Sequence, residues 1–122
     1  VIFTIVMINV SKKNKKNKKS QEIIQQYESE IQPEKLSYTD SEFNTMANSL
    51  FKAMDGIGTN ENAIYEVFQK MKTNSDVLKL QAAFGVRNDM DLFEYIRDDM
   101  NNDDIAKLNG YLAQHNISIR IS

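Results

Sequence analysis

The sequence predicts an all-α protein. From residue 36 onward, apolar residues recur at three- and four-residue steps, polar capping residues precede each such stretch, and Gly, Asn or Asp separates them. The chain has 122 residues, of which 41% are hydrophobic and one is proline, so it suffices for one small domain and a tail. We expect a helical domain over residues 36–116, two segments before it, and a short extended tail over residues 117–122.

The first segment combines an apolar stretch with a lysine cluster. Residues 1–10, VIFTIVMINV, are uncharged, and six lysines follow within residues 12–19. A membrane segment followed by a stop-transfer cluster has this order. Since a spanning helix needs about 20 residues, residues 1–19 are interpreted as a truncated membrane anchor with a lysine-rich stretch, which places the domain on the cytoplasmic side. The alternative is a buried β-strand, because Val, Ile, Phe and Thr favour strands.

The second segment, residues 20–35, has the pattern of a short amphipathic helix. Pro33 is expected to end it. The apolar residues at helical spacing are Ile23, Ile24, Tyr27 and Ile31. Four such positions are too few for a sustained coiled coil. We expect a spacer helix that docks on the domain or extends from the membrane.

The first two domain helices flank a break that contains two glycines. Thr39 and Glu42 have the spacing of a capping box, and apolar residues continue at helical steps to Met54. Asp55–Gly58 interrupts this pattern, and Thr59 is the expected cap of the second helix. The apolar stripe of the second helix consists of Ala63, Ile64, Val67, Phe68 and Met71.

Three further helices complete the domain. Asn74 or Ser75 is expected to cap the third, Gly85–Asn88 separates it from the fourth, and Asn101–Asp104 introduces the fifth. The apolar residues of the third helix are Val77, Leu78, Leu80, Ala82, Ala83 and Phe84. Those of the fourth are Met90, Leu92, Phe93, Ile96 and Met100, and those of the fifth are Ile105, Leu108, Tyr111 and Leu112.

The tail over residues 117–122 alternates apolar and polar side chains, which is typical of a strand. A single strand needs a partner, so we expect it to pair with another chain or with residues 1–10. The side chains expected in the core of the domain are Leu50, Phe51, Ile64, Phe68, Phe84, Phe93, Ile96 and Leu108.

Charge and residue types limit the function classes. Residues 20–122 carry nine basic and seventeen acidic groups, which disfavours binding to nucleic-acid phosphates. The chain lacks cysteine and has one histidine, His115, so thiol catalysis and multi-histidine metal centres are excluded. Asp98, Asp99, Asp103 and Asp104 form an acidic cluster whose carboxylates could serve in catalysis or metal binding. Asp103 and Asp104, however, stand at a helix start, where the helix macrodipole favours negative charge. We expect no enzymatic activity.

The loop Met54–Thr59 has the residue types of a calcium site. Gly56 and Gly58 allow a tight turn in which successive carbonyl oxygens face one point. Calcium takes about six to eight oxygen ligands and accepts backbone carbonyls together with a carboxylate from elsewhere. The alternative is that the two glycines only form the turn of a helix–loop–helix.

These residues carry a resemblance to a known family. Phe51–Glu61 resembles the opening of an annexin repeat, whose signature is a hydrophobic residue, Lys, Gly, any residue, Gly, Thr and acidic residues. Leu80–Phe84 resembles the third helix of the repeat, and Asp91–Phe93 the fourth. The similarity covers about residues 37–113, one repeat of a family that usually contains four. Asp55 departs from it, because the family usually has Lys or Arg there.

The resemblance implies a single five-helix repeat and a calcium ion that bridges the protein to acidic phospholipid. The implied ligands are the carbonyls of Met54, Gly56 and Gly58 and the carboxylate of Asp99, or failing that of Asp98. Asp99 stands where the family usually has the longer Glu.

We therefore expect a non-enzymatic, membrane-tethered annexin-like binding module with calcium as cofactor and an anionic membrane surface as partner. A covalent anchor would replace the avidity that a lone repeat lacks. The alternative is a structural or protein-interaction module of a bacterial envelope or phage assembly, with another protein as its partner and no calcium requirement.

Overall fold

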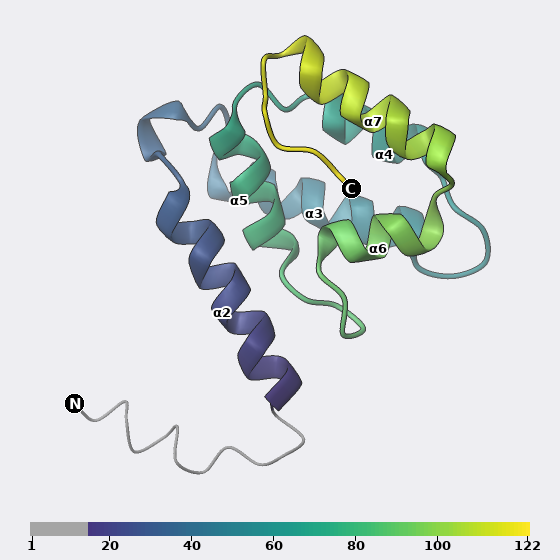
Figure 1. Cartoon of the computed structure of the whole chain (residues 1–122), viewed down its shortest axis with the longest axis horizontal. Coiled ribbons are helices and arrows are strands. Elements are labelled where there is room, and N and C mark those ends of the chain that lie inside the picture. The colour runs from purple at the N-terminus through teal and green to yellow at the C-terminus, as the bar shows by residue number, and fades with distance from the viewer. Residues whose placement is uncertain (1–14) are drawn as a thin grey trace.

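A computed structural model describes residues 15–122 of the chain (Figure 1). These residues form six α-helices and one 3₁₀ helix, and residues 15–122 contain no strand, so the predicted all-α class is confirmed. The elements are α2 (Lys15–Glu30), η2 (Pro33–Lys35), α3 (Asp40–Met54), α4 (Glu61–Gln69), α5 (Asn74–Phe84), α6 (Leu92–Asp99) and α7 (Asn102–Gln114).

Helix α3 lies at the centre of the packing. It contacts α4, α5 and α6, while α7 covers α4 and α2 lies along α5 (Figure 1). Large apolar side chains from the five α-helices after α2 meet in one core, and burying each of them contributes about 1.5–3 kcal/mol. The largest fully buried side chains are Phe43, Phe68, Phe84, Leu50, Ile64, Met71, Leu80, Leu92, Ile96, Leu108, Leu112 and Ile117.

Side chains at the helix starts satisfy backbone N–H groups that have no partner within the helix. Thr39 and Glu42 form the predicted capping box of α3. Asp91 and Glu94 form a second capping box at α6. Asn101 caps α7 by accepting a hydrogen bond from the third N–H of that helix at 2.8 Å.

Two predicted caps are wrong by one or two residues. Asn60, not Thr59, caps α4, because the Thr59 hydroxyl donates to a carbonyl at the end of α6. Thr73, not Asn74 or Ser75, caps α5. Both of those side chains have tertiary partners instead, since Asn74 holds the C-terminal tail and Ser75 accepts from the backbone just before η2.

Helix α2 docks on the domain, which was one of the two expected arrangements for the spacer. It begins at Lys15 and ends at Glu30, three residues before Pro33. None of its described side chains is fully buried; those half-covered by the rest of the fold are Ile23, Ile24 and Tyr27. This helix is therefore a peripheral layer rather than part of the core.

A buried carboxylate joins the segment after α2 to α5. Asp76 is fully buried and accepts hydrogen bonds from the Ser37 N–H at 2.8 Å, the Ser37 hydroxyl at 2.7 Å and the Lys72 N–H at 3.0 Å. The Thr73 hydroxyl donates to the Lys35 carbonyl at 2.9 Å. These bonds hold the chain between η2 and α3 against the start of α5.

The C-terminal tail crosses the helices without forming a strand (Figure 1). Ile117 and Ile121 are buried in the core, which explains the alternating pattern. Asparagine side chains from α5 and α7 bind the tail backbone, in place of a neighbouring strand. The expected pairing with residues 1–10 lies outside the described residues.

Two predicted core residues are only half-buried, namely Phe51 and Phe93. The guanidinium of Arg87 lies over the Phe51 ring, 5.2 Å from its centre. The six other predicted core residues are buried.

No helix within residues 15–122 has both the length and the apolar character needed to cross a bilayer. The predicted anchor, residues 1–10, lies outside the described residues.

Candidate functional site

The candidate site is the loop between α3 and α4. Gly56 and Gly58 have φ angles of 110° and 80°, which side chains with a Cβ rarely adopt. The Asn60 N–H donates to the Ala53 carbonyl at 2.9 Å and closes the loop. The two glycines are therefore required by the backbone conformation, as the sequence predicts.

The end of α6 lies against this loop. The Thr59 hydroxyl donates to the Asp99 carbonyl at 3.4 Å, which joins residues forty positions apart. The pKa of the Asp99 carboxyl is raised, first by burial and then by the negative charges of Asp98 and Asp55. A cation near Asp99 would relieve this repulsion.

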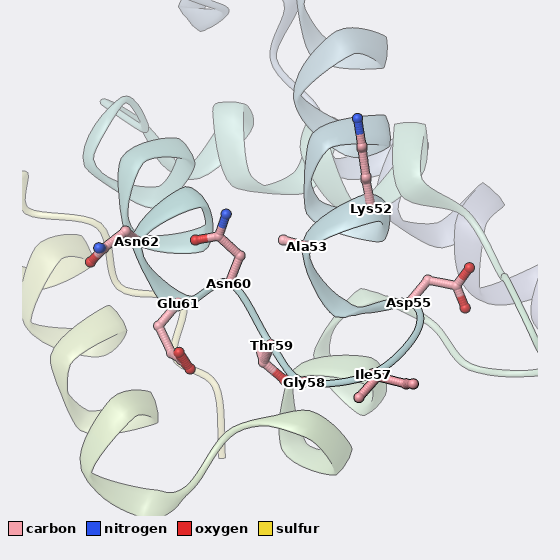
Figure 2. Close-up of a pocket in the computed structure, with 9 residues that line it drawn as sticks. All are labelled: Lys52, Ala53, Asp55, Ile57, Gly58, Thr59, Asn60, Glu61 and Asn62. Carbon is pink, nitrogen blue, oxygen red and sulfur yellow. The ribbon is translucent and has the colours of Figure 1, made fainter.

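A surface hollow of about 540 Å³ adjoins the loop (Figure 2). It lies between the last turn of α3 and the first turn of α4, and its lining residues include Lys52, Asp55, Gly58 and Glu61. The side chain of Ile57, between the two glycines, is fully exposed. The loop thus presents charged, polar and apolar groups on one surface.

The structure brings three of the predicted ligands into one region. Gly56 and Gly58 lie in the loop, and Asp99 lies beside it. Met54 ends α3 with a buried side chain, so only its backbone carbonyl can be a ligand. Asp98 is exposed on the last turn of α6.

The oxygen atoms at this loop could bind a hard cation only if backbone carbonyls supplied most of the ligands. Within residues 15–122, no three acidic or histidine side chains converge to hold a metal ion. The carbonyls of the loop, together with Asp99, would have to supply most ligands, and calcium accepts such a set. Asp55, which departs from the family pattern, carries a negative charge that contributes to the raised pKa of Asp99, after burial and the charge of Asp98.

The remaining titratable candidates lie elsewhere. His115 is exposed at the C-terminal end of α7. Asp103 and Asp104 lie in the first turn of α7, and the Tyr65 hydroxyl donates to Asp104 at 2.8 Å. This hydrogen bond raises the pKa of Tyr65 to about 12. The acidic cluster of the sequence is therefore divided between two helix ends.

Comparison of the chain with protein-family models, with curated proteins and with solved structures gives no match. The resemblance to an annexin repeat stays a prediction.

Proposed function

We propose that residues 36–116 are a single annexin-like module that binds calcium in the α3–α4 loop and attaches through the ion to anionic phospholipid. One observation carries this proposal: a glycine loop with two positive φ angles lies beside Asp99, whose pKa is raised first by burial and then by neighbouring acids. Asp99 and the carbonyls of Met54, Gly56 and Gly58 are the proposed ligands.

The charge at the site supports a cation. Asp55 and Asp98 both disfavour the ionised form of Asp99, so that a bound divalent ion would gain from all three carboxylates. Calcium accepts carbonyl and carboxylate oxygens and leaves coordination positions for water or for phosphate oxygens of a lipid. The protein supplies a partial shell, and the lipid headgroup completes it.

The exposed tip of the loop supports a bilayer as the partner. Ile57 is the one large hydrophobic side chain within residues 15–122 that is fully exposed. An apolar side chain beside a cation site matches the boundary between headgroups and acyl chains. Residues 1–19 would add a membrane tether and an attraction of about 1 kcal/mol for each lysine near an anionic surface, with the domain on the cytoplasmic side.

A protein-interaction module without calcium is the second candidate. Every buried side-chain nitrogen and oxygen within residues 15–122 has a hydrogen-bond partner, so this part of the fold needs no ion to satisfy its core. In that role Ile57 would contact another protein of a bacterial envelope or phage assembly.

Calorimetric titration of the full chain with calcium tests the proposal. We expect a weak affinity, on the order of 10⁻⁴ to 10⁻³ M, as for calcium sites with few carboxylates. Gly56→Val should abolish binding, because valine cannot adopt the φ angle of this position. Asp99→Asn should weaken it strongly, and Asp98→Asn should have the smaller effect.

Vesicle co-sedimentation tests the lipid step. Calcium should increase binding to phosphatidylserine vesicles over binding in chelator at the same ionic strength, and Ile57→Ser should reduce the increment. Because the lysines alone bind anionic vesicles, only the calcium-dependent increment counts. The calcium proposal fails if, at about 10 mM calcium, above the expected range, the protein gives no heat of binding and calcium does not increase its binding to vesicles. That result would support the protein-interaction module.

A further inference from the structure

Asn109 holds the C-terminal tail with both polar atoms of its side-chain amide. Its Oδ1 atom accepts a hydrogen bond from the Ile121 N–H, and its Nδ2 atom donates to the Ile121 carbonyl, each at 2.8 Å. Ile121 and Ile117 are buried in the core, so these bonds keep the apolar side chains of the tail in place. The closed position of the tail therefore depends on an intact amide at position 109.

The residue after Asn109 is a glycine that the fold does not require. Gly110 lies within α7 and does not have a positive φ angle. Among the residues that the structure describes, a Cβ at this position would meet nothing within 4 Å apart from its own helical turn. Glycine in a helix interior is destabilising relative to alanine. Asn109 is also the only asparagine of the chain that precedes a glycine.

An asparagine followed by glycine is chemically labile, because the side-chain amide can be lost to the next backbone nitrogen. That nitrogen attacks the carbon Cγ, and the new C–N bond closes a succinimide ring. The bond from Cγ to Nδ2 breaks, and ammonia leaves with the proton of the backbone N–H. Water then opens the ring at either carbonyl and gives aspartate or isoaspartate. Glycine favours the attack, since it has no Cβ and its backbone turns freely.

The folded chain restrains both reacting groups. In an α-helix each N–H donates to the carbonyl four residues earlier, which engages the backbone nitrogen of Gly110. The backbone of Ile121 holds the amide of Asn109. Release of the tail frees the amide directly. It also leaves the end of α7 without its cover, and helix ends fray.

We propose that Asn109–Gly110 is a latent modification site, at which spontaneous deamidation turns a released tail into one that does not rebind. Aspartate at position 109 places a negative charge against the Ile121 carbonyl, where the amide donates now. Isoaspartate adds a methylene to the main chain and so interrupts α7. The site contains no residue of the α3–α4 loop, so it stands or fails independently of the calcium proposal.

Mass spectrometry of the peptide that contains position 109 follows the reaction in the full chain at mildly alkaline pH. Because only the opened tail reacts, deamidation should be at least about tenfold slower in native buffer than in concentrated urea, which corresponds to an opening free energy of about 1.4 kcal/mol. Gly110→Ala, which the helix accommodates, should slow the reaction in urea as well. Equal rates in native buffer and in urea overturn the proposal.

Hydrogen exchange of the Ile121 N–H measures the same opening, since this group donates to Asn109. Low urea concentrations should raise the exchange rate and the deamidation rate by the same factor. So should Asn74→Ala, which removes the bonds from Ser118 and Ile119 that hold the tail to α5. Faster exchange without faster deamidation overturns the proposal, because α7 alone would then protect the site.

The deamidated protein provides a third measurement. Its additional negative charge allows its separation from the unmodified protein by ion exchange. After return to native buffer, the Ile121 N–H of the deamidated protein should exchange faster than that of the unmodified protein. Equal protection in the two forms would show that the tail rebinds, and it would overturn the proposal.

Discussion

At the scale of single residues, Asp76 is the buried side chain whose loss should destabilise the fold strongly. Its buried carboxylate serves three donors from two segments. Asp76→Ala would leave the N–H groups of Ser37 and Lys72 without a partner, and hydrogen bonds to a charged group are worth about 1.5–3 kcal/mol. We expect a loss of about 2–4 kcal/mol in the free energy of unfolding, measured by urea denaturation.

Ser37→Ala is the matched control for this prediction. It removes only the hydroxyl bond to Asp76 and keeps the backbone bond, so the loss should be about 1 kcal/mol. Equal losses in the two variants would contradict the central role of Asp76.

Asp99 provides a prediction in the pH dependence of the loop. Its folded pKa is raised, so at neutral pH the folded state carries an electrostatic cost that the unfolded chain lacks. Asp99→Asn should therefore raise the melting temperature of the calcium-free protein at pH 7. That advantage should shrink as the pH falls through the raised pKa, because the folded wild-type protein then takes up a proton on Asp99, which removes the cost of burying the charge and the repulsion from Asp98 and Asp55.

Calcium binding should also depend on the ionisation of Asp99, and it should weaken as the pH falls. The ion requires the carboxylate, so protons compete with it and the calcium concentration for half-saturation should increase as the pH falls through the raised pKa of Asp99. Titrations at several pH values measure this. A pH-independent affinity would mean that Asp99 is not a ligand.

At the scale of helices, the half-burial of Phe93 distinguishes two aromatic positions that look alike in the sequence. Phe68 on α4 is fully buried, so Phe68→Ala should cost about 3–5 kcal/mol of unfolding free energy. Phe93 on α6 is half-buried, so Phe93→Ala should cost less, below about 2 kcal/mol. Chemical denaturation of both variants checks the order, and equal costs would contradict the burial seen here.

Helix α2 is expected to open locally before the rest of the molecule. Its described apolar side chains are only half-covered, while α3 contributes six buried residues. Hydrogen exchange should therefore be faster for amides of α2 than for those of α3. Ile24→Asp should accelerate exchange in α2 alone; a parallel acceleration in α3 would show that the two helices unfold as one unit.

At the scale of the whole molecule, the tail connects elements that are distant in the sequence. It lies between the start of α5 and the middle of α7, and its two buried isoleucines belong to the common core. Asn109→Asp keeps the acceptor for the Ile121 N–H but removes the donor to its carbonyl and places a negative charge there. We expect a loss of about 1–3 kcal/mol in unfolding free energy.

Asn48→Asp, an exposed change on α3, is the control for charge alone and should change stability by less than about 0.5 kcal/mol. Similar losses at positions 48 and 109 would mean that the amide does not hold the tail.

The sequence by itself determined the features that depend on neighbours within about one helical turn. The helical class, the breaks between helices and the capping box of Thr39 and Glu42 are readable because the interacting residues stand three or four positions apart. The need for glycine at positions 56 and 58 is local in the same sense, since it follows from backbone sterics.

Only the tertiary structure decided which polar side chain serves which partner. Thr59 and Asn74 are good helix caps by residue type, yet each binds a segment about forty residues away. Arg87 lies over the half-buried Phe51 ring, and the charge of Asp55 contributes to the raised pKa of Asp99, although each pair is more than thirty residues apart in the sequence. The physical reason is that a side chain's preference for a local bond is worth only about 1 kcal/mol, and long-range packing, which no short pattern encodes, outweighs it.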